Sequence, residues 1–168
     1  MEKNSRLTKT VFILYLAILT WAVIFKFALK GSDLPFRHEI NLIPFDESAF
    51  ADGRLRLSEI ILNLLAFIPF GMYISMFKRN WSAGKRVLAG FLLSLAYEVS
   101  QYVFSLGLLD VTDFITNTAG TWIGVRLYPA LRKTFGEKTE KIVSRTTLVL
   151  EIIFFCLAAV LIFANRNG

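Results

Sequence analysis

The sequence predicts an all-α fold: a polytopic integral membrane helix bundle of about five transmembrane helices, with its N-terminus in the cytoplasm. The 168 residues are 55% hydrophobic and 14% aromatic, and the mean hydropathy is +0.54. A soluble domain of this length has no core large enough to bury so much apolar surface, whereas lipid covers a membrane protein. Several apolar runs also reach the length of about 20 residues that a spanning helix needs. Besides composition and the length of the apolar runs, the positive charges are distributed unevenly between the segments expected on the two sides of the membrane.

Five apolar runs are expected to span the membrane, and together they make a single membrane domain over residues 1–168. The first run follows Lys3, Arg6 and Lys9 and has no small-residue cleavage site, so it is interpreted as a retained helix and not as a signal peptide. The third and fourth runs are joined by a short turn near Gly107, which makes them antiparallel neighbours. The expected spans are 10–29, 59–77, 87–106, 111–130 and 147–164.

The positive charges orient the bundle. If the N-terminus is cytoplasmic, thirteen Lys and Arg residues fall in cytoplasmic segments and five in outer ones. This asymmetry predicts a cytoplasmic N-terminus and an outer C-terminus. Most of the net charge of +6 lies in these cytoplasmic segments, where positive side chains are attracted to anionic lipid. Nucleic-acid binding is therefore not inferred from that charge. The expected localisation is the cell membrane, as a multi-pass protein.

Polar side chains that are costly in lipid interrupt three of the runs. A carboxylate at the centre of a membrane helix costs about 2.5–3.5 kcal/mol on insertion scales, so such residues usually face a bundle or a wet cavity. At 1.5 Å per residue, these side chains lie about 5 to 12 Å below the outer ends of their helices. They therefore share the outer half of the bilayer: Asn63, Glu98, Gln101, Asp113 and Asn117.

The same residues share helix faces. Glu98 and Gln101 are three residues apart, and small residues continue their stripe. Steps of three and four also relate Asp110, Asp113, Asn117, Gly120 and Gly124 on the next helix. Gly120 and Gly124 form a G-x-x-x-G that allows two backbones to approach closely. The stripes of the third and fourth helices are expected to face each other.

Structural roles explain several of these residues as well as a binding site does. Asp110 opens a helix, where a carboxylate caps free N–H groups, and Asp113 admits both capping and site membership. Asn117 and Gln101 fit a structural role in interhelical hydrogen bonds as well as they fit a binding site. No cap explains Glu98, which lies two turns deep. Lys26 either pairs with Glu98 or Asp113 or extends to the interface.

The outer loop 30–58 is the longest outer connection and is amphipathic, with Pro44 and Phe45 among its apolar residues. Such a segment lies along the interface as a connector or folds over the polar cluster as a lid.

These residues together resemble the VanZ family of membrane proteins, associated with resistance to lipoglycopeptides such as teicoplanin. The resemblance runs from about Arg37 to Gly124 and rests on four motifs in order: Asn41-Leu-Ile-Pro-Phe45; Asn63 with Phe67-Ile-Pro-Phe-Gly71; Glu98-x-x-Gln101; and Asp110-Val-Thr-Asp113 with Asn117-Thr-x-Gly120. It implies a VanZ-like core over about 10–130 and a role in the cell envelope. Residues 131–168, a basic cytoplasmic loop and a fifth helix, are an addition to that core.

Two positions depart from the family pattern. Many members have an arginine shortly after the third helix and a further acid in the D-x-D-D segment, where this chain has Leu108 and Thr112. A mechanism that needs that arginine is therefore in doubt for this chain.

Three functions stay open. The leading hypothesis is binding or handling of an amphiphile at the outer leaflet, a lipid-linked cell-wall precursor or a lipoglycopeptide. Its polar head would contact Asn63, Glu98, Gln101, Asp110, Asp113 and Asn117 under the loop at Pro44 and Phe45. An intramembrane hydrolase or transferase would use Glu98 and Asp113 as acid and base. A proton-coupled carrier or flippase would protonate Glu98, but the inner half of the bundle is expected to lack matching polar residues.

No cofactor or metal is expected. Cys156 and His38 are each the single residue of their type, and they supply no metal-ligand set. The expected partners are a lipid or lipid-linked envelope molecule and the membrane, and not nucleic acid.

Overall fold

The computed structural model describes residues 2–24, 40–45, 50–51, 54–55, 57–107 and 109–167. These residues are mostly helical, which confirms the predicted fold class at that level. The helices are α1 (Glu2–Ile24), α2 (Leu57–Phe77), α3 (Ala83–Val103), α4 (Val111–Phe135), the short 3-10 helix η3 (Gly136–Lys138) and α5 (Thr139–Asn167). Four two-residue strands accompany them: β1 (Ile40–Asn41), β2 (Phe50–Ala51), β3 (Arg54–Leu55) and β4 (Leu109–Asp110).

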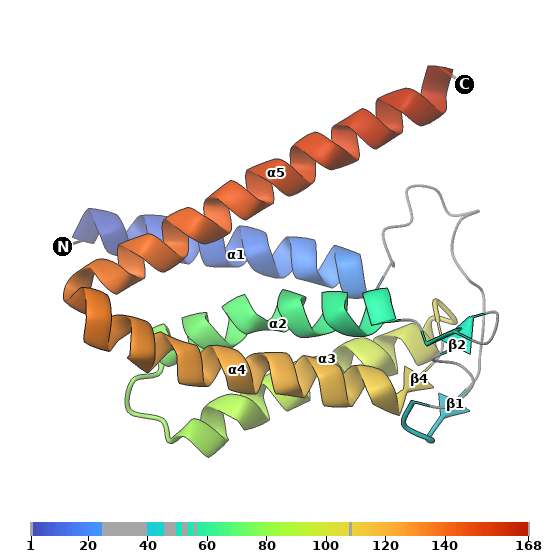
Figure 1. The fold of residues 1–168 in the computed structure, drawn as a ribbon, viewed down its shortest axis with the longest axis horizontal. Coiled ribbons are helices and arrows are strands. Elements are labelled where there is room, and N and C mark those ends of the chain that lie inside the picture. The colour runs from blue at the N-terminus through green and yellow to red at the C-terminus, as the bar shows by residue number, and fades with distance from the viewer. Residues whose placement is uncertain are drawn as a thin grey trace.

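The helices α1 to α4 lie side by side and alternate in direction, whereas α5 crosses over α1 and its C-terminal part points away from the bundle (Figure 1). The two ends of the bundle differ. We call the end with β1 and β4 the β-pair end, and the end with the α2–α3 turn and the start of α1 the basic end (Figure 1).

Two segments, Arg6–Ile24 and Leu57–Phe77, have the length and composition of membrane spans, each with a mean hydropathy of 2.0. They were the expected first and second spans. The count of five spans and the cytoplasmic N-terminus stay predictions.

The helices extend beyond the apolar runs that predicted them. α4 continues to Phe135, and α5 begins at Thr139 after the three residues of η3. The segment 131–146, expected to be a basic loop, is therefore largely helical. Hydropathy marks only the part of a helix that lipid would surround, but backbone hydrogen bonding continues where the helix enters water. Gly136, with a φ of 57°, makes the break between the two helices.

Two hydrophobic clusters, each containing aromatic residues, fill the interior between the helices. One joins Tyr15 of α1, Phe67 of α2 and Tyr97 of α3. Its two hydroxyl groups are satisfied, because Tyr15 donates to the carbonyl of Ala66 at 2.6 Å and Tyr97 lies 2.9 Å from the hydroxyl of Thr20. The other cluster, nearer the basic end, contains Val11, Tyr73, Met76, Tyr128 and Val143.

The glycine pair of α4 faces α2 and not α3, which corrects the expected packing. A Cβ built on Gly120 would meet the carbonyl oxygen of Leu64, and one on Gly124 would meet that of Ile68 and approach Gly71 Cα to 2.9 Å. The sequence expectation was wrong because it assigned the glycines to the neighbour along the chain, although Gly71 supplies the matching small residue on α2.

Candidate functional site

The β-pair end brings the loop 40–45 beside the start of α4. β1 pairs in parallel with β4, so that Ile40 is opposite Leu109 and Asn41 is opposite Asp110. Phe45 then donates its backbone N–H to the hydroxyl of Thr112 at 3.1 Å, from a backbone with a φ of 56°. Pro44 lies in the exposed turn just before it. Two motifs about seventy residues apart in the chain are thus held together.

Asp110 caps α4, as predicted, and Glu98 supports the cap. The carboxylate of Asp110 accepts the backbone N–H of Thr112 at 2.8 Å, and its own backbone N–H donates to Oε2 of Glu98 at 3.0 Å. The Glu98 side chain is 0% exposed. A carboxylate that accepts a backbone N–H in the interior is stabilised there by a charge-assisted hydrogen bond. Glu98 therefore ties α3 to the first residues of α4.

Asn63 and Asp113 meet at a cavity. The amide Nδ2 of Asn63 donates to Oδ1 of Asp113 at 2.6 Å, and both side chains are partly buried. The cavity has a volume of ≈ 230 Å³ and lies between α1, α2 and the start of α4. Its lining combines polar groups with apolar walls: Ala22, Val23, Ser58, Glu59, Leu62, Asn63 and Asp113.

The other two predicted site residues contact different partners. Gln101 donates to the backbone carbonyl of Val23 at 2.9 Å, which fixes the end of α1. Asn117 donates to the hydroxyl of Ser94 at 2.9 Å, which joins α4 to α3. Both are buried, and neither is among the described residues that line the cavity. Their geometry is that of interhelical hydrogen bonds, the structural alternative for these two amides.

Two acidic residues were missed by the sequence reasoning. Glu59 lines the cavity one turn before Asn63, and the four-residue spacing of the two would have indicated a shared face. Glu151 of α5 is 6% exposed, and neither of its carboxylate oxygens has a hydrogen-bond partner among the described residues. Its position within the fifth apolar run was the available signal.

The half of the bundle nearer the basic end was expected to lack buried polar residues, but it contains several. Besides Glu151, it buries Thr8, Ser144 and Thr147, and Ser144 donates to the hydroxyl of Thr8 at 3.0 Å. Thr8 and Ser144 lie just outside the apolar runs expected to span, and Thr147 begins the last of them, so hydropathy did not mark these residues as buried. Lys26 and Leu108, and most of the loop 30–58, lie outside the described residues.

Comparison with known proteins decides the family. The family model described as VanZ/LLP1 matches residues 12–132. The chain belongs to the VanZ family. It is also 34% identical to "Protein VanZ" of Enterococcus faecium over 134 residues, which cover 79% of this chain and 80% of that protein. No solved structure matches significantly. VanZ membership and the two apolar helices together indicate a membrane protein.

Thr112 stands where an acid was expected in many VanZ family members. Its hydroxyl accepts the backbone N–H of Phe45, and its own backbone N–H donates to the carboxylate of Asp110. The Thr112 side chain is 3% exposed. This position therefore fastens the loop 40–45 to α4 and does not present a charge to the cavity.

Proposed function

We propose that this protein binds the polar head of an amphiphile at the outer leaflet, in the cavity beside Asn63 and Asp113. The observation that carries the proposal is that Asn63 and Asp113, from two of the four family motifs, meet at that cavity, at the end of the bundle where β1 pairs with the segment before α4. A lipid-linked cell-wall precursor and a lipoglycopeptide both have a head rich in hydroxyl and amide groups and an apolar tail. Carboxylate and amide side chains hydrogen-bond such a head.

The surroundings of the cavity support an amphiphilic ligand over a wholly polar one. Val23 and Leu62 form part of its wall, and Leu62 is 56% exposed. In a bilayer, an exposed leucine on α2 contacts lipid chains, so a tail can lie there while the head reaches Asp113. Concave sites with apolar walls and a few convergent polar groups are typical ligand sites.

The loop 40–45 is proposed to cover or flank the bound head. Its apolar side chains point outward beside the polar cluster: Leu42 is 70% exposed, Ile43 62% and Phe45 44%. Apolar residues so exposed suit the membrane interface. The Phe45–Thr112 hydrogen bond supports this, because Thr112 directly precedes Asp113, which lines the cavity.

Binding is favoured over catalysis by the different positions of the two carboxylates. An acid–base pair must reach the same reacting group. Asp113 lines the cavity, whereas Glu98 is fully buried and accepts the backbone N–H of Asp110. A proton-coupled carrier is the second candidate, and the buried Glu151 of α5 favours it, because acidic residues inside a membrane bundle often belong to proton relays.

The test uses two tryptophan substitutions on the same helix. Leu62→Trp fills the cavity, whereas Leu65→Trp is the matched control, because Leu65 is 53% exposed and is not among the lining residues. Purified protein in nanodiscs is titrated with teicoplanin, with a lipid-linked cell-wall precursor and with a glycopeptide that lacks the acyl tail. We expect saturable binding of an acylated probe, about tenfold weaker in Leu62→Trp and unchanged in Leu65→Trp. Equal affinities for the two variants would contradict the site, and equal binding of the tail-less probe would contradict the amphiphile.

The outer-leaflet part of the proposal is tested separately. In a Cys156→Ser background, a cysteine at position 48 should react with an impermeant thiol reagent on intact cells, and one at position 84 should not. Labelling at position 84 alone overturns the orientation and with it the outer leaflet.

A further inference from the structure

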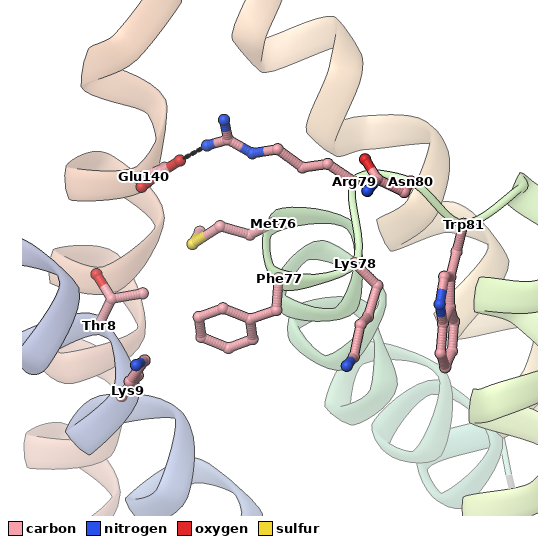
Figure 2. Close-up of a pocket in the computed structure, with 9 residues that line it drawn as sticks. All are labelled: Thr8, Lys9, Met76, Phe77, Lys78, Arg79, Asn80, Trp81 and Glu140. Carbon is pink, nitrogen blue, oxygen red and sulfur yellow. Dashed lines mark hydrogen bonds and ion pairs between the residues drawn. The ribbon is translucent and has the colours of Figure 1, made fainter.

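A second cavity lies at the basic end, far from Asn63 and Asp113 along the bundle. Its volume is ≈ 510 Å³. Residues of α1, of the end of α2, of the α2–α3 turn and of α5 surround it (Figure 2): Thr8, Lys9, Met76, Phe77, Lys78, Arg79, Asn80, Trp81 and Glu140. This size lies within the range of small-molecule sites, about 300–1,000 Å³.

The charged lining of this cavity is predominantly cationic. Lys9, Lys78 and Arg79 contribute positive charge, against the single carboxylate of Glu140, which pairs with Arg79 (Figure 2). The amine of Lys78 lies 5.4 Å from the centroid of the Trp81 ring. A cation over an aromatic face keeps its ability to donate hydrogen bonds to an anion. Lys9 and Lys78 both line the cavity, so both can contribute positive charge to an anionic group bound there.

The turn that carries these residues is held in place from outside the cavity. Arg86 of α3 donates to the carbonyl oxygens of Lys78 at 3.1 Å and of Arg79 at 2.8 Å. Ser82 caps α3 by accepting the N–H of Lys85 at 3.3 Å. The turn is therefore ordered before a ligand arrives, which reduces the entropic cost of binding.

The remaining lining is apolar and partly open. Phe77 is 37% exposed and Trp81 39%, whereas Met76 is nearly buried. A free inorganic anion has no apolar group to contact these side chains. A phospholipid can contact both the cationic and the apolar lining, because its phosphate binds the cations and its glycerol and upper chain segments pack on the aromatic rings. Tryptophan also prefers the level of the head groups.

We propose that this cavity binds the phosphate head group of an anionic phospholipid in the cytoplasmic leaflet. Basic pockets between helices on the cytoplasmic side hold such head groups through charge and hydrogen bonds. The proposal is independent of the outer site. It uses the predicted orientation, which the cysteine labelling above tests.

The experiment reads the site through Trp81. The chain has three tryptophans, so a Trp21→Phe, Trp122→Phe background leaves Trp81 as the single fluorophore. The full chain in neutral detergent is titrated with short-chain phosphatidylglycerol, with phosphatidylcholine of the same chains and with inorganic phosphate. We expect a saturable emission change with phosphatidylglycerol at concentrations about tenfold below any response to the other two.

A pair of double variants separates a site from general charge attraction. Lys9→Gln with Lys78→Gln should raise the half-saturating concentration of phosphatidylglycerol about tenfold. Lys85→Gln with Lys133→Gln removes the same charge outside the described lining and should change it less than about twofold. An equal loss in both doubles, an equal response to phosphatidylcholine, or an equal response to inorganic phosphate overturns the proposal.

If the Lys9, Lys78 double variant does not fold, Lys9→Gln alone decides the question. Lys9 is exposed on α1 and takes no part in the α2–α3 turn. Its variant should bind phosphatidylglycerol at least about threefold more weakly, and an unchanged affinity counts against the site.

Discussion

The helix α4 contacts its two neighbours in different ways. Against α2, beyond the Asn63–Asp113 hydrogen bond near its start, it places glycines, so that Gly120 and Gly124 approach backbone atoms of α2. Against α3 it places polar groups, with Asn117 bonded to Ser94 and the start of the helix bonded to Glu98. The first contact sets the distance between two helices, and the second sets their register. A membrane bundle needs both, because lipid provides no hydrophobic force between helices.

The largest expected effect is at the glycine contact. Gly124→Leu would force a side chain into the carbonyl of Ile68 and the backbone around Gly71. Because backbone cannot move aside as a side chain can, we expect a loss of about 3 kcal/mol or failure to fold. Thermal unfolding of the detergent-purified protein measures it. Gly84→Leu is the matched control, since a Cβ there meets nothing within 4 Å. If both variants melt alike, the α2–α4 contact is not the close one described.

The cap at the start of α4 should give a smaller effect. Asp110→Ala removes the acceptor of the Thr112 N–H and should cost about 1 kcal/mol, whereas Asp110→Asn keeps an oxygen and should melt near the parent. The same melting assay compares them. Equal losses in both variants would show that the charge of Asp110, and not its capping oxygen, stabilises the fold.

The polar contact with α3 should be weaker still. A double-mutant cycle with Asn117→Ala and Ser94→Ala isolates their 2.9 Å hydrogen bond. Interhelical hydrogen bonds of this type average about 0.6 kcal/mol in membranes, so we expect a coupling of that order. Reversible unfolding in mixed micelles supplies the four free energies. A coupling of zero would mean that Asn117 is retained for something other than this bond.

The two contacts of α4 also differ in how far the sequence could predict them. Apolar runs and helix spacing predicted the helical class, the bounds of α2 within two residues and the Asp110 cap, because these depend on local periodicity. The partner of Gly120 and Gly124 was missed, because a glycine stripe says that something approaches closely but not which helix does. The β1–β4 pairing was missed for a related reason, since two-residue strands carry no periodic signal.

Within the candidate site, the sequence predicted the level of each polar residue along its helix but not the neighbouring helix that its side chain contacts. The five polar residues were placed at one level from the rise per residue, yet only Asn63 and Asp113 line the cavity. Gln101 and Asn117 instead bond to Val23 and Ser94. A helix face is about 100° wide, so residues on one face can point toward different neighbours.

The smallest expected effect, and the most discriminating, is Glu98→Gln. Glu98 accepts the backbone N–H of Asp110 at 3.0 Å and is 0% exposed. A glutamine amide oxygen can accept the same N–H, so the free energy of unfolding should change by less than about 0.5 kcal/mol, the low end of the net contribution of one hydrogen bond. If Glu98 only joins α3 to α4, teicoplanin tolerance in a susceptible host should also persist, with protein level checked by blot. Asp113→Asn, which changes a group that lines the cavity, should reduce tolerance while the protein still folds. If instead a well-folded Glu98→Gln protein loses tolerance, the carboxyl acts through its charge or its proton. The polar contact between α3 and α4 would then be part of the chemistry, as the catalytic and carrier hypotheses require, and not only a means of setting register.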